Sequence, residues 1–224
     1  MTDRWATFDC YGTLIDWHAG IRAAMRRAWP DADLEHLIGL HHAVEPLVQA
    51  GRRLPYRQVG ARTLRAIAAI ENLPLAPRDE FALADTLPDW PAFPEVRAAL
   101  STLRQHRWRL AILSNTDPDL LAASLVQIGV PVDERITAAE AGSYKPAPGH
   151  WRQFFERTGA DHARHVHVAA SLYHDISPAA ELGLVAVWIN RLGEHSDLPR
   201  AAELTDLSQL PMVLERLVPA QAAG

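Results

Sequence analysis

Several polar side chains in this sequence stand where apolar runs end, and their types could do chemistry. Asp9 follows the apolar run "RWATF", Ser114 follows "LAIL", and Asp175 comes shortly after "HVHVAA". A carboxylate in such a place can act as a nucleophile, a base or a metal ligand. Lys145, within "GSYKPAP", supplies a positive charge that could pair with a carboxylate. These residue types could together make a catalytic site.

Asp9 is followed at once by "CYGT". Gly12 permits a sharp backbone turn there, and Thr13 offers a hydroxyl group that could also cap a helix. Backbone N–H groups in such a turn could surround a bound anion. The alternative is that Asp9 only caps a helix after the strand. Because Ser114 and Lys145 fall at matching places, the functional interpretation is favoured.

Lys145 is the only lysine in a chain with 22 Lys and Arg residues. The flanking Gly142, Pro146 and Pro148 fix the conformation of its loop. A lysine held beside Asp9 would keep that carboxylate ionised, because a nearby opposite charge lowers a carboxylate pKa. A solvated surface lysine is the alternative, but a lone lysine in a proline-framed loop favours a functional role.

The remaining strand-end residues allow two interpretations each. Ser114 and Asn115 could donate hydrogen bonds to an anionic substrate group or to a leaving group. Asn115 or Thr116 could instead simply cap the following helix. Asp175 could orient Lys145 or a water molecule, or it could cap the helix that begins near residue 176.

The elements that must position these residues alternate along most of the chain. From residue 92 onward, predicted strands alternate with predicted helices, which is typical of an α/β fold with a parallel sheet covered on both faces. We predict strands over 4–9, 108–115, 134–140, 165–171 and 184–191, and helices over 95–106, 117–129, 147–159, 176–183 and 207–218. In such sheets, ligands bind outside the carboxyl ends of the strands. The polar strand ends are therefore expected to converge on one crevice.

Residues 17–91 show helical periodicity throughout, with expected helices over 18–29, 33–51, 56–73 and 77–87. An all-helical segment that follows the first strand is expected to form a second, cap-like domain. We therefore predict a sheet-containing core from residues 1–16 and 92–224 and a helical cap from residues 17–91.

Composition excludes several classes of protein. The chain has 224 residues, 48% of them hydrophobic, which is enough for a full domain core and a smaller domain. The net charge is −5 and the basic residues are dispersed, so we expect no nucleic-acid partner. No apolar run approaches the ~20 residues of a membrane span, and because Asp3 and Arg4 lead straight into the first strand we expect no signal peptide. With a single cysteine, Cys10, a cytoplasmic protein is expected.

The motifs "FDCYGTLID", "LSNT", the "YKP" lysine and the "S-x-x-x-D" spacing after the fourth strand occur in this order. Together they resemble the motifs of the haloacid dehalogenase superfamily over nearly the whole chain. The resemblance implies a Rossmann-like parallel sheet core with an inserted helical cap. It also implies that Asp9 is a nucleophile that forms a covalent ester or acyl phosphate.

Most members of that superfamily are phosphatases with a second acid two residues after the nucleophile and a magnesium-binding acid in the last motif. Here Tyr11 and Ser171 stand at those two positions. Loss of a general acid alone costs roughly 10²–10⁴ in rate, and phosphoryl transfer also needs charge stabilisation by a metal. Displacement of a halide from carbon needs neither group, because halide is a weak base. The "D-x-Y-G-T" form resembles the 2-haloacid dehalogenase subfamily, so we predict no metal site and no cofactor.

The resemblance implies a two-step hydrolysis of small 2-haloacids, such as haloacetate, to 2-hydroxy acids, with halide as the second product. Asp9 would displace the halide and form an ester, which water then hydrolyses near Asp175 with Lys145 in support. The expected catalytic residues are Asp9, Thr13, Lys145, Ser171 and Asp175. The expected substrate-binding residues are Tyr11, Ser114, Asn115, His174 and His42.

The sequence departs from the subfamily at two further places. Leu172 stands where the subfamily has an asparagine, and the neighbouring His174 could replace it as a polar group or base. The subfamily also has an arginine early in the second cap helix, where this chain reads "LIGLHHAVEPL". His41 or His42 could take its role, or both could be structural; Arg52 and Arg53 are further candidates.

Three alternatives stay open from sequence. The same nucleophile could open another carbon–halogen or a strained carbon–nitrogen bond. A magnesium-dependent phosphatase is disfavoured by Tyr11 and Ser171, and a non-catalytic binding protein is disfavoured by the intact set of strand-end residues. A homodimer is expected only by analogy with the family.

Overall fold

The computed structural model describes residues 3–50 and 54–221. Its centre is a six-stranded sheet in the order β3-β2-β1-β4-β5-β6, and every pair of neighbouring strands is parallel. The strands are β1 (Arg4–Phe8), β2 (Trp108–Ser114), β3 (Glu134–Thr137), β4 (His165–Ala169), β5 (Ala186–Ile189) and β6 (Ala202–Leu204). The predicted α/β fold class, a Rossmann-like parallel sheet with helices on both faces and an inserted helical cap, is confirmed.

β1 lies in the middle of the sheet and is buried along its whole length. It pairs with β2 on one side, where Phe8 faces Ile112, and with β4 on the other, where Phe8 faces Val168. Because the strands are parallel, their carboxyl ends meet at one edge of the sheet. The residue after β1, Asp9, is thereby placed at the middle of that edge.

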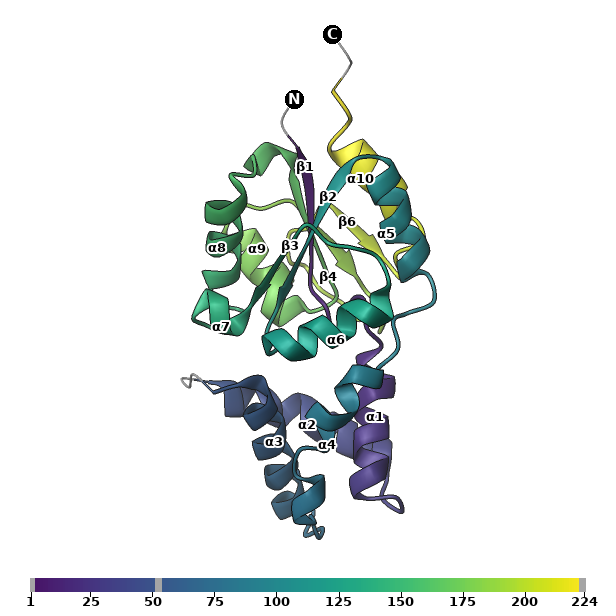
Figure 1. Ribbon diagram of the computed structural model, residues 1–224, viewed down its shortest axis with the longest axis vertical. Helices are drawn as coiled ribbons and strands as arrows, with labels where there is room; N and C mark the ends of the chain where they lie inside the picture. Colours follow the sequence, from purple (N-terminus) through teal and green to yellow (C-terminus); the bar gives the residue numbers. More distant parts are fainter. Residues whose placement is uncertain (1–2, 51–53, 222–224) are drawn as a thin grey trace.

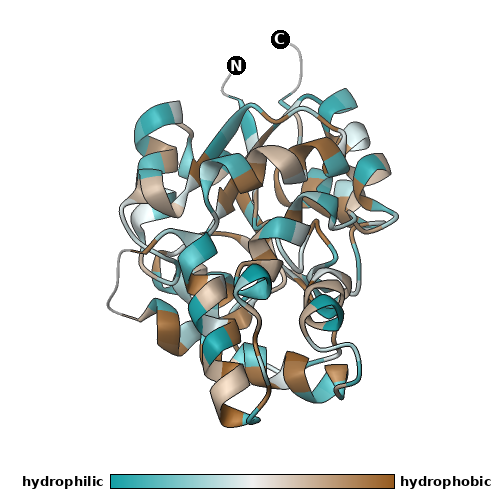
Figure 2. Cartoon of the chain, turned by 60° about the horizontal axis from the view of Figure 1, so that its bottom comes forward, coloured by the Kyte–Doolittle hydropathy of each residue, from teal (hydrophilic) through white to brown (hydrophobic). Residues whose placement is uncertain are grey.

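Helices cover both faces of the sheet (Figure 1). They are α5 (Val96–Gln105), α6 (Pro118–Ile128), α7 (Ala138–Ala141), α8 (Gly149–Thr158), α9 (Ser177–Glu181) and α10 (Leu210–Leu217). On the α8 face, the side chains Trp5, Leu113, Ile136, Trp151 and Phe154 form one apolar cluster. On the opposite face, Ala6, Phe8, Leu110 and Ile112 pack with residues of α5 and α10, including Leu100, Leu103 and Leu214. Figure 2, in which the cap end comes forward, shows hydrophobic and hydrophilic residues mixed along the helices.

The segment between β1 and α5 is helical and lies beyond the carboxyl edge of the sheet (Figure 1). It contains α1 (Trp17–Ala28), α2 (Leu34–Gln49), α3 (Tyr56–Ile70) and α4 (Ala82–Thr86), which we call the helical cap. Asp16 begins α1, because its side chain accepts a hydrogen bond of 2.9 Å from the N–H of Ala19. The two chain crossings between cap and sheet are joined by bonds from Asp16 N to Pro91 O (2.8 Å) and from Phe93 N to Leu14 O (3.0 Å).

Some predicted elements are wrong in detail. The helix expected over 77–87 is broken into a 3₁₀ turn at Pro77–Asp79, the short α4, and a second turn at Leu87–Asp89 that contains Pro88. The strand expected over 134–140 ends at Thr137, which with Glu140 forms a capping box that begins α7. β6 was not predicted; it is a three-residue edge strand without an apolar run.

No helix among residues 3–50 and 54–221 is long and apolar enough to span a membrane.

Candidate active site

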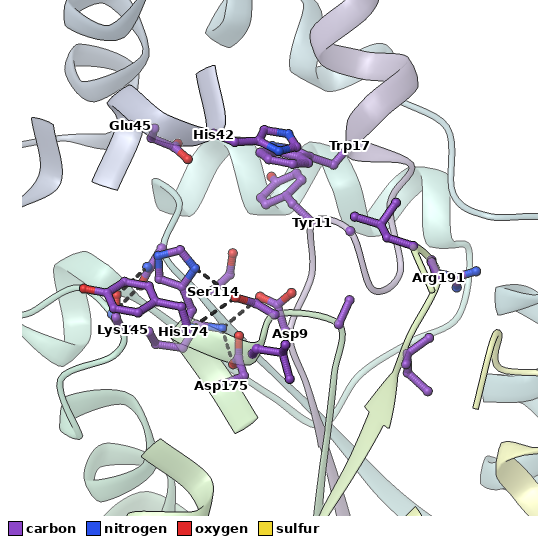
Figure 3. Close-up of a pocket in the computed structure, with 18 of the residues that line it drawn as sticks. Asp9, Tyr11, Trp17, His42, Glu45, Ser114, Lys145, His174, Asp175 and Arg191 are labelled. Carbon is purple, nitrogen blue, oxygen red and sulfur yellow. Dashed lines mark hydrogen bonds and ion pairs between the residues drawn. The ribbon is translucent and has the colours of Figure 1, made fainter. Parts of the chain in front are cut away.

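A cavity of about 720 Å³ lies between the carboxyl edge of the sheet and the helical cap. All predicted site residues except Thr13 line it, and Thr13 contacts a residue that does. The structure thus brings together side chains that the sequence placed at separate strand ends (Figure 3). The cavity-lining members of the predicted set are Asp9, Tyr11, His42, Ser114, Asn115, Lys145, Ser171, His174 and Asp175.

Both oxygens of the Asp9 carboxylate are held by neighbouring groups. Oδ1 accepts a hydrogen bond of 2.8 Å from Lys145 Nζ, and Oδ2 accepts one of 2.8 Å from the Thr13 hydroxyl. The Thr13 oxygen in turn accepts a bond of 2.9 Å from the N–H of Ala170, which follows β4. The turn between Asp9 and Thr13 contains Gly12 at φ +86°, a conformation that favours glycine. Asp9 is therefore fixed in direction before any substrate arrives.

Lys145 lines the cavity, yet its side chain is only 1% exposed. It donates to Asp9 Oδ1, to Asp175 Oδ1 at 2.7 Å and to the carbonyl of Leu113 at 2.8 Å. Burial alone would lower the pKa of Lys145, but the charges of Asp175 and Asp9 raise it above the ordinary lysine value. With its three donors in use, the ammonium stays charged and binds the two carboxylates together.

Asn115 holds the loop that carries Lys145. Its side-chain oxygen accepts from the Lys145 N–H at 2.7 Å, and its amide nitrogen donates to the Lys145 carbonyl at 3.1 Å. In the same loop, the Tyr144 hydroxyl donates to the carbonyl of Leu54 in the cap at 2.6 Å. The expected substrate-binding role of Asn115 stays a prediction, since these contacts assign its amide to the Lys145 loop.

Asp175 is fully buried, and its two oxygens differ in their contacts. Oδ1 interacts with Lys145 Nζ and with His167 Nε2 at 3.0 Å, whereas Oδ2 has no hydrogen-bond partner among the residues that the structure describes. Burial alone would raise the pKa of Asp175, yet Lys145 and His167 hold it below its ordinary range. The residue is thus a carboxylate with one unused acceptor atom at the cavity.

A π-helical turn, Leu172–Ile176, presents both His174 and Asp175. Ser171 begins this turn, because its hydroxyl oxygen accepts a bond of 3.0 Å from the His174 N–H. The same oxygen lies 3.1 Å from His174 Nδ1. Burial lowers the pKa of His174, so its ring is neutral near pH 7 and can accept a proton. Ser171 thereby contributes to the site by orienting His174.

The cap side of the cavity carries aromatic rings and a carboxyl group. His42 stacks on Trp17 with ring centroids 4.4 Å apart, and burial lowers the pKa of His42 to about 4. Burial also lowers the pKa of His41 to about 3. Neither histidine therefore carries a positive charge near neutral pH, and His42 can contact a ligand only as a neutral ring. The other candidates, Arg52 and Arg53, lie outside the described residues.

Glu45 points from α2 toward the cavity, and sequence reasoning assigned it no role (Figure 3). It is 7% exposed, and its Oε1 has no hydrogen-bond partner among residues 3–50 and 54–221. Burial raises its pKa, although hydrogen bonds from Tyr56 and Gln49 and the nearby His174 oppose the rise. No periodicity could have found it, because which helix face meets the sheet depends on how the cap is joined to the core.

Arg191, just beyond β5, was also missed. Its Nη2 donates to the Thr13 carbonyl at 2.9 Å and to Glu95 at 2.6 Å, and its guanidinium lies 3.6 Å from the centre of the Phe93 ring. Through these contacts Arg191 joins the turn after Asp9 to residues 93–95, where the chain returns from the cap to the sheet. The arginine at a strand end was the available signal.

Six parallel strands, a helical cap inserted after β1 and an acid–lysine–acid cluster at the carboxyl edge define a capped α/β protein with a Rossmann-like core. The model of the haloacid dehalogenase-like hydrolase family matches residues 4–183, and the chain belongs to that family.

Individual relatives extend the similarity over almost the whole chain. The chain is 26% identical to (S)-2-haloacid dehalogenase 1 of Pseudomonas sp. (strain CBS-3), over 96% of this chain and 97% of the relative. It is 28% identical to haloacetate dehalogenase H-2 of Moraxella sp. (strain B), over 83% and 85%. Among solved structures, the L-2-haloacid dehalogenase of Xanthobacter autotrophicus with covalently bound chloropropionic acid superposes with a TM-score of 0.84. It shares 19% identity, over 96% of this chain and 99% of that chain.

Proposed function

We propose that this protein is a hydrolytic dehalogenase that converts 2-haloacids to 2-hydroxy acids. One observation carries the proposal: Asp9 lies at the cavity floor, aimed by Lys145 and Thr13, with a tyrosine rather than an acid two residues later. Such a site holds a carboxylate nucleophile ready for carbon while lacking the proton donor that a phosphate ester leaving group needs. The haloacid and haloacetate dehalogenases among the relatives support the same reaction class.

The proposed reaction has two steps. An Asp9 oxygen forms a bond to C2 of the acid, and the carbon–halogen bond breaks with its electron pair leaving as halide. A water oxygen then adds to the ester carbonyl of Asp9, and one water proton is taken up by a neighbouring base. When this adduct collapses, the base returns its proton to the leaving alkoxide oxygen and releases the 2-hydroxy acid. The second water proton is lost to solvent, which restores the Asp9 carboxylate. The covalent chloropropionic acid complex of the Xanthobacter enzyme supports an intermediate of this kind.

Roles in the second step follow from the contacts. Asp175 Oδ2, which has no hydrogen-bond partner in the described part of the chain, can accept a hydrogen bond from the attacking water. The neutral ring of His174 can take up the proton. Lys145 keeps Asp175 ionised throughout.

We also propose that the reaction needs no metal ion. The Asp9 and Asp175 carboxylates already share the ammonium of Lys145, which neutralises charge at the place where a dication would bind. Ser171, whose hydroxyl begins the π-helical turn, provides no carboxylate ligand.

The direct test is halide release from chloroacetate, fluoroacetate and L-2-chloropropionate, each with and without EDTA. We expect release from at least one acid, unchanged by EDTA, with the matching 2-hydroxy acid as product. Hydrolysis of a phosphate ester with added magnesium is measured in parallel. Activity only on the phosphate ester would refute the proposal, and halide release abolished by EDTA would refute metal independence.

Glu45→Gln tests how the cap carboxyl affects an anionic substrate. Burial raises the pKa of Glu45. The carboxyl group is therefore neutral at pH values below this raised pKa and becomes negatively charged as the pH rises through it. We expect the KM for chloroacetate to rise roughly tenfold as Glu45 ionises, the ratio that 1.4 kcal/mol of like-charge repulsion gives. In Glu45→Gln the KM should stay flat. A parallel rise of KM in both proteins would contradict this role.

Tyr11→Phe separates the ring of Tyr11 from its hydroxyl. The hydroxyl bonds to the Ser124 hydroxyl at 2.9 Å, away from the Asp9 carboxylate, while the ring packs edge-on against Trp90. We expect the variant to lose about 1 kcal/mol of unfolding free energy in urea, the usual value of one hydrogen bond. The rate of halide release should change less than threefold, because the lost hydrogen bond does not involve Asp9. A loss of activity well beyond that would assign chemistry to the hydroxyl.

A further inference from the structure

A chain of buried polar side chains continues from Asp175 into the sheet. His167 Nε2 lies 3.0 Å from Asp175 Oδ1, and His167 Nδ1 lies 2.9 Å from the Thr7 hydroxyl. The same hydroxyl lies 2.8 Å from His165 Nε2. All of these side chains are fully buried. None of the proposed chemical steps uses His167, Thr7 or His165, which we call the histidine–threonine chain.

The register of the sheet produces this arrangement. Thr7 on β1 lies directly opposite His167 on β4. Side chains two apart on a strand point to the same face, so His165 joins them. Around them lie apolar rings, since Trp151 meets His167 edge-on at 5.3 Å and Phe154 lies 5.3 Å from His165. The chain therefore runs through an aromatic layer under α8.

Burying the polar side chains of His167, Thr7 and His165 in central strands costs folding free energy, which suggests that they serve a function. Central strands of a parallel sheet are usually near-continuous Val, Ile and Leu, because both faces are buried. A buried polar group costs free energy unless it is hydrogen-bonded. Within residues 3–50 and 54–221, His165 Nδ1 has no hydrogen-bond partner, so the arrangement is not optimised for stability. What the chain does achieve is a continuous set of hydrogen bonds that ends on Asp175 Oδ1.

The direction of the hydrogen bonds follows from the carboxylate. Asp175 is ionised and can only accept, so His167 Nε2 must carry a hydrogen. His165 Nε2 donates to the Thr7 oxygen, because a hydrogen on the unpaired His165 Nδ1 would be a buried donor without an acceptor, and the Thr7 hydroxyl then donates to His167 Nδ1. Burial lowers the pKa of His165 to about 3, so that ring is neutral and has one nitrogen with which to donate. Every bond in the chain then points toward Asp175.

We propose that His167, fixed by Thr7 and His165, is a positioning residue that holds Asp175 Oδ1 in place so that Oδ2 can orient the hydrolytic water. The inference rests on the proposed function. When Asp9 becomes an ester, Lys145 loses one of its two carboxylate partners and is free to shift with Asp175. The His167 bond prevents that shift. Its effect belongs to ester hydrolysis and not to halide displacement.

The test separates the two steps. With enzyme in excess over chloroacetate, halide release reports ester formation, glycolate release reports ester hydrolysis, and intact-protein mass reports the ester itself. We expect His167→Phe to form ester at nearly the wild-type rate. Glycolate release should slow roughly tenfold to a hundredfold, the range seen when an outer hydrogen-bond partner is lost, and the ester should accumulate. His167→Gln, which can place an N–H where Nε2 was, should restore most of the rate.

Thr7 provides a second pair of variants in case His167→Phe does not fold. Thr7→Val removes the hydroxyl at constant shape and should slow glycolate release alone, whereas Thr7→Ser should behave as wild type. Thr63→Val is the matched control, because Thr63 in α3 is equally buried and its hydroxyl has no partner. Equal slowing of halide and glycolate release, no slowing of either, or failure of Gln and Ser to rescue would overturn the inference. If wild-type enzyme releases no halide, the proposed function fails instead.

Discussion

Asp9→Asn is expected to abolish halide release from every 2-haloacid, with a loss of at least about 10⁴-fold, as for other enzymes that lose their nucleophile. The amide nitrogen of asparagine has no electron pair available to attack C2. The variant should nevertheless stay folded, because Lys145 keeps one carboxylate partner, Asp175, at 2.7 Å. Ion chromatography of released halide and a urea unfolding curve measure the two quantities.

Asp79→Asn is the matched control for this variant. Asp79 is also buried, at 7% exposed, and is also paired, with Arg27 Nε at 3.1 Å, but it lies in the cap outside the cavity lining. It should keep wild-type halide release. A second readout is available in wild-type enzyme: in single turnovers in H₂¹⁸O, the label should appear on Asp9 and not in the product acid. Label found directly in the product would mean that water attacks C2 without an ester.

Lys145→Met is expected to destabilise the protein by about 3–5 kcal/mol at pH 7, the usual result of removing one partner from a buried ion pair. The Asp9 and Asp175 side chains would then face each other without a cation, at 11% and 0% exposure. Halide release should fall as well, because Asp9 loses the bond that aims Oδ1. Urea unfolding at several pH values measures the change in free energy.

The loss of stability in Lys145→Met is expected to depend on pH, and its direction follows from the pKa of Asp175. In wild type, the pKa of Asp175 is lowered by folding, so its contribution to stability is present above the ordinary aspartate pKa and is lost as pH falls through the lowered value. In Lys145→Met the pKa of Asp175 should rise, because the lysine charge that lowers it is gone, and protonation should relieve the repulsion in mild acid. The destabilisation should therefore shrink as pH falls. Adding Asp175→Asn to Lys145→Met should recover part of the lost stability, and simple additivity of the two losses would contradict the account.

Much of the site could be predicted because polar residues at the ends of apolar strands are visible in a sequence. Asp9, Ser114 and Asp175 each follow such a run, and parallel topology sends all of them to one edge. Lys145 was conspicuous as the only lysine. In contrast, Glu45 could not be predicted, because its position over the cavity depends on how the chain crossings orient the cap.

The histidine–threonine chain could not be predicted from the sequence for a different reason. "HVHVA" was correctly assigned to a strand, but a strand pattern does not reveal which neighbouring strand will lie opposite His167. Register and cross-strand partners arise only when the sheet assembles. β6 likewise becomes a strand only because it pairs with β5 at the sheet edge, since its own residues carry no strand pattern.

The contacts of Arg191 have a mechanical consequence. The two chain crossings between cap and sheet are bonded to each other, and Arg191 links the carbonyl of Thr13 with Glu95 across them. A swing of the cap must therefore turn about this bonded pair, since either crossing moved alone would break the bonds that join them. This bonded pair of crossings adjoins the turn that orients Asp9. A swing of the cap about this bonded pair would therefore also move the turn that orients Asp9.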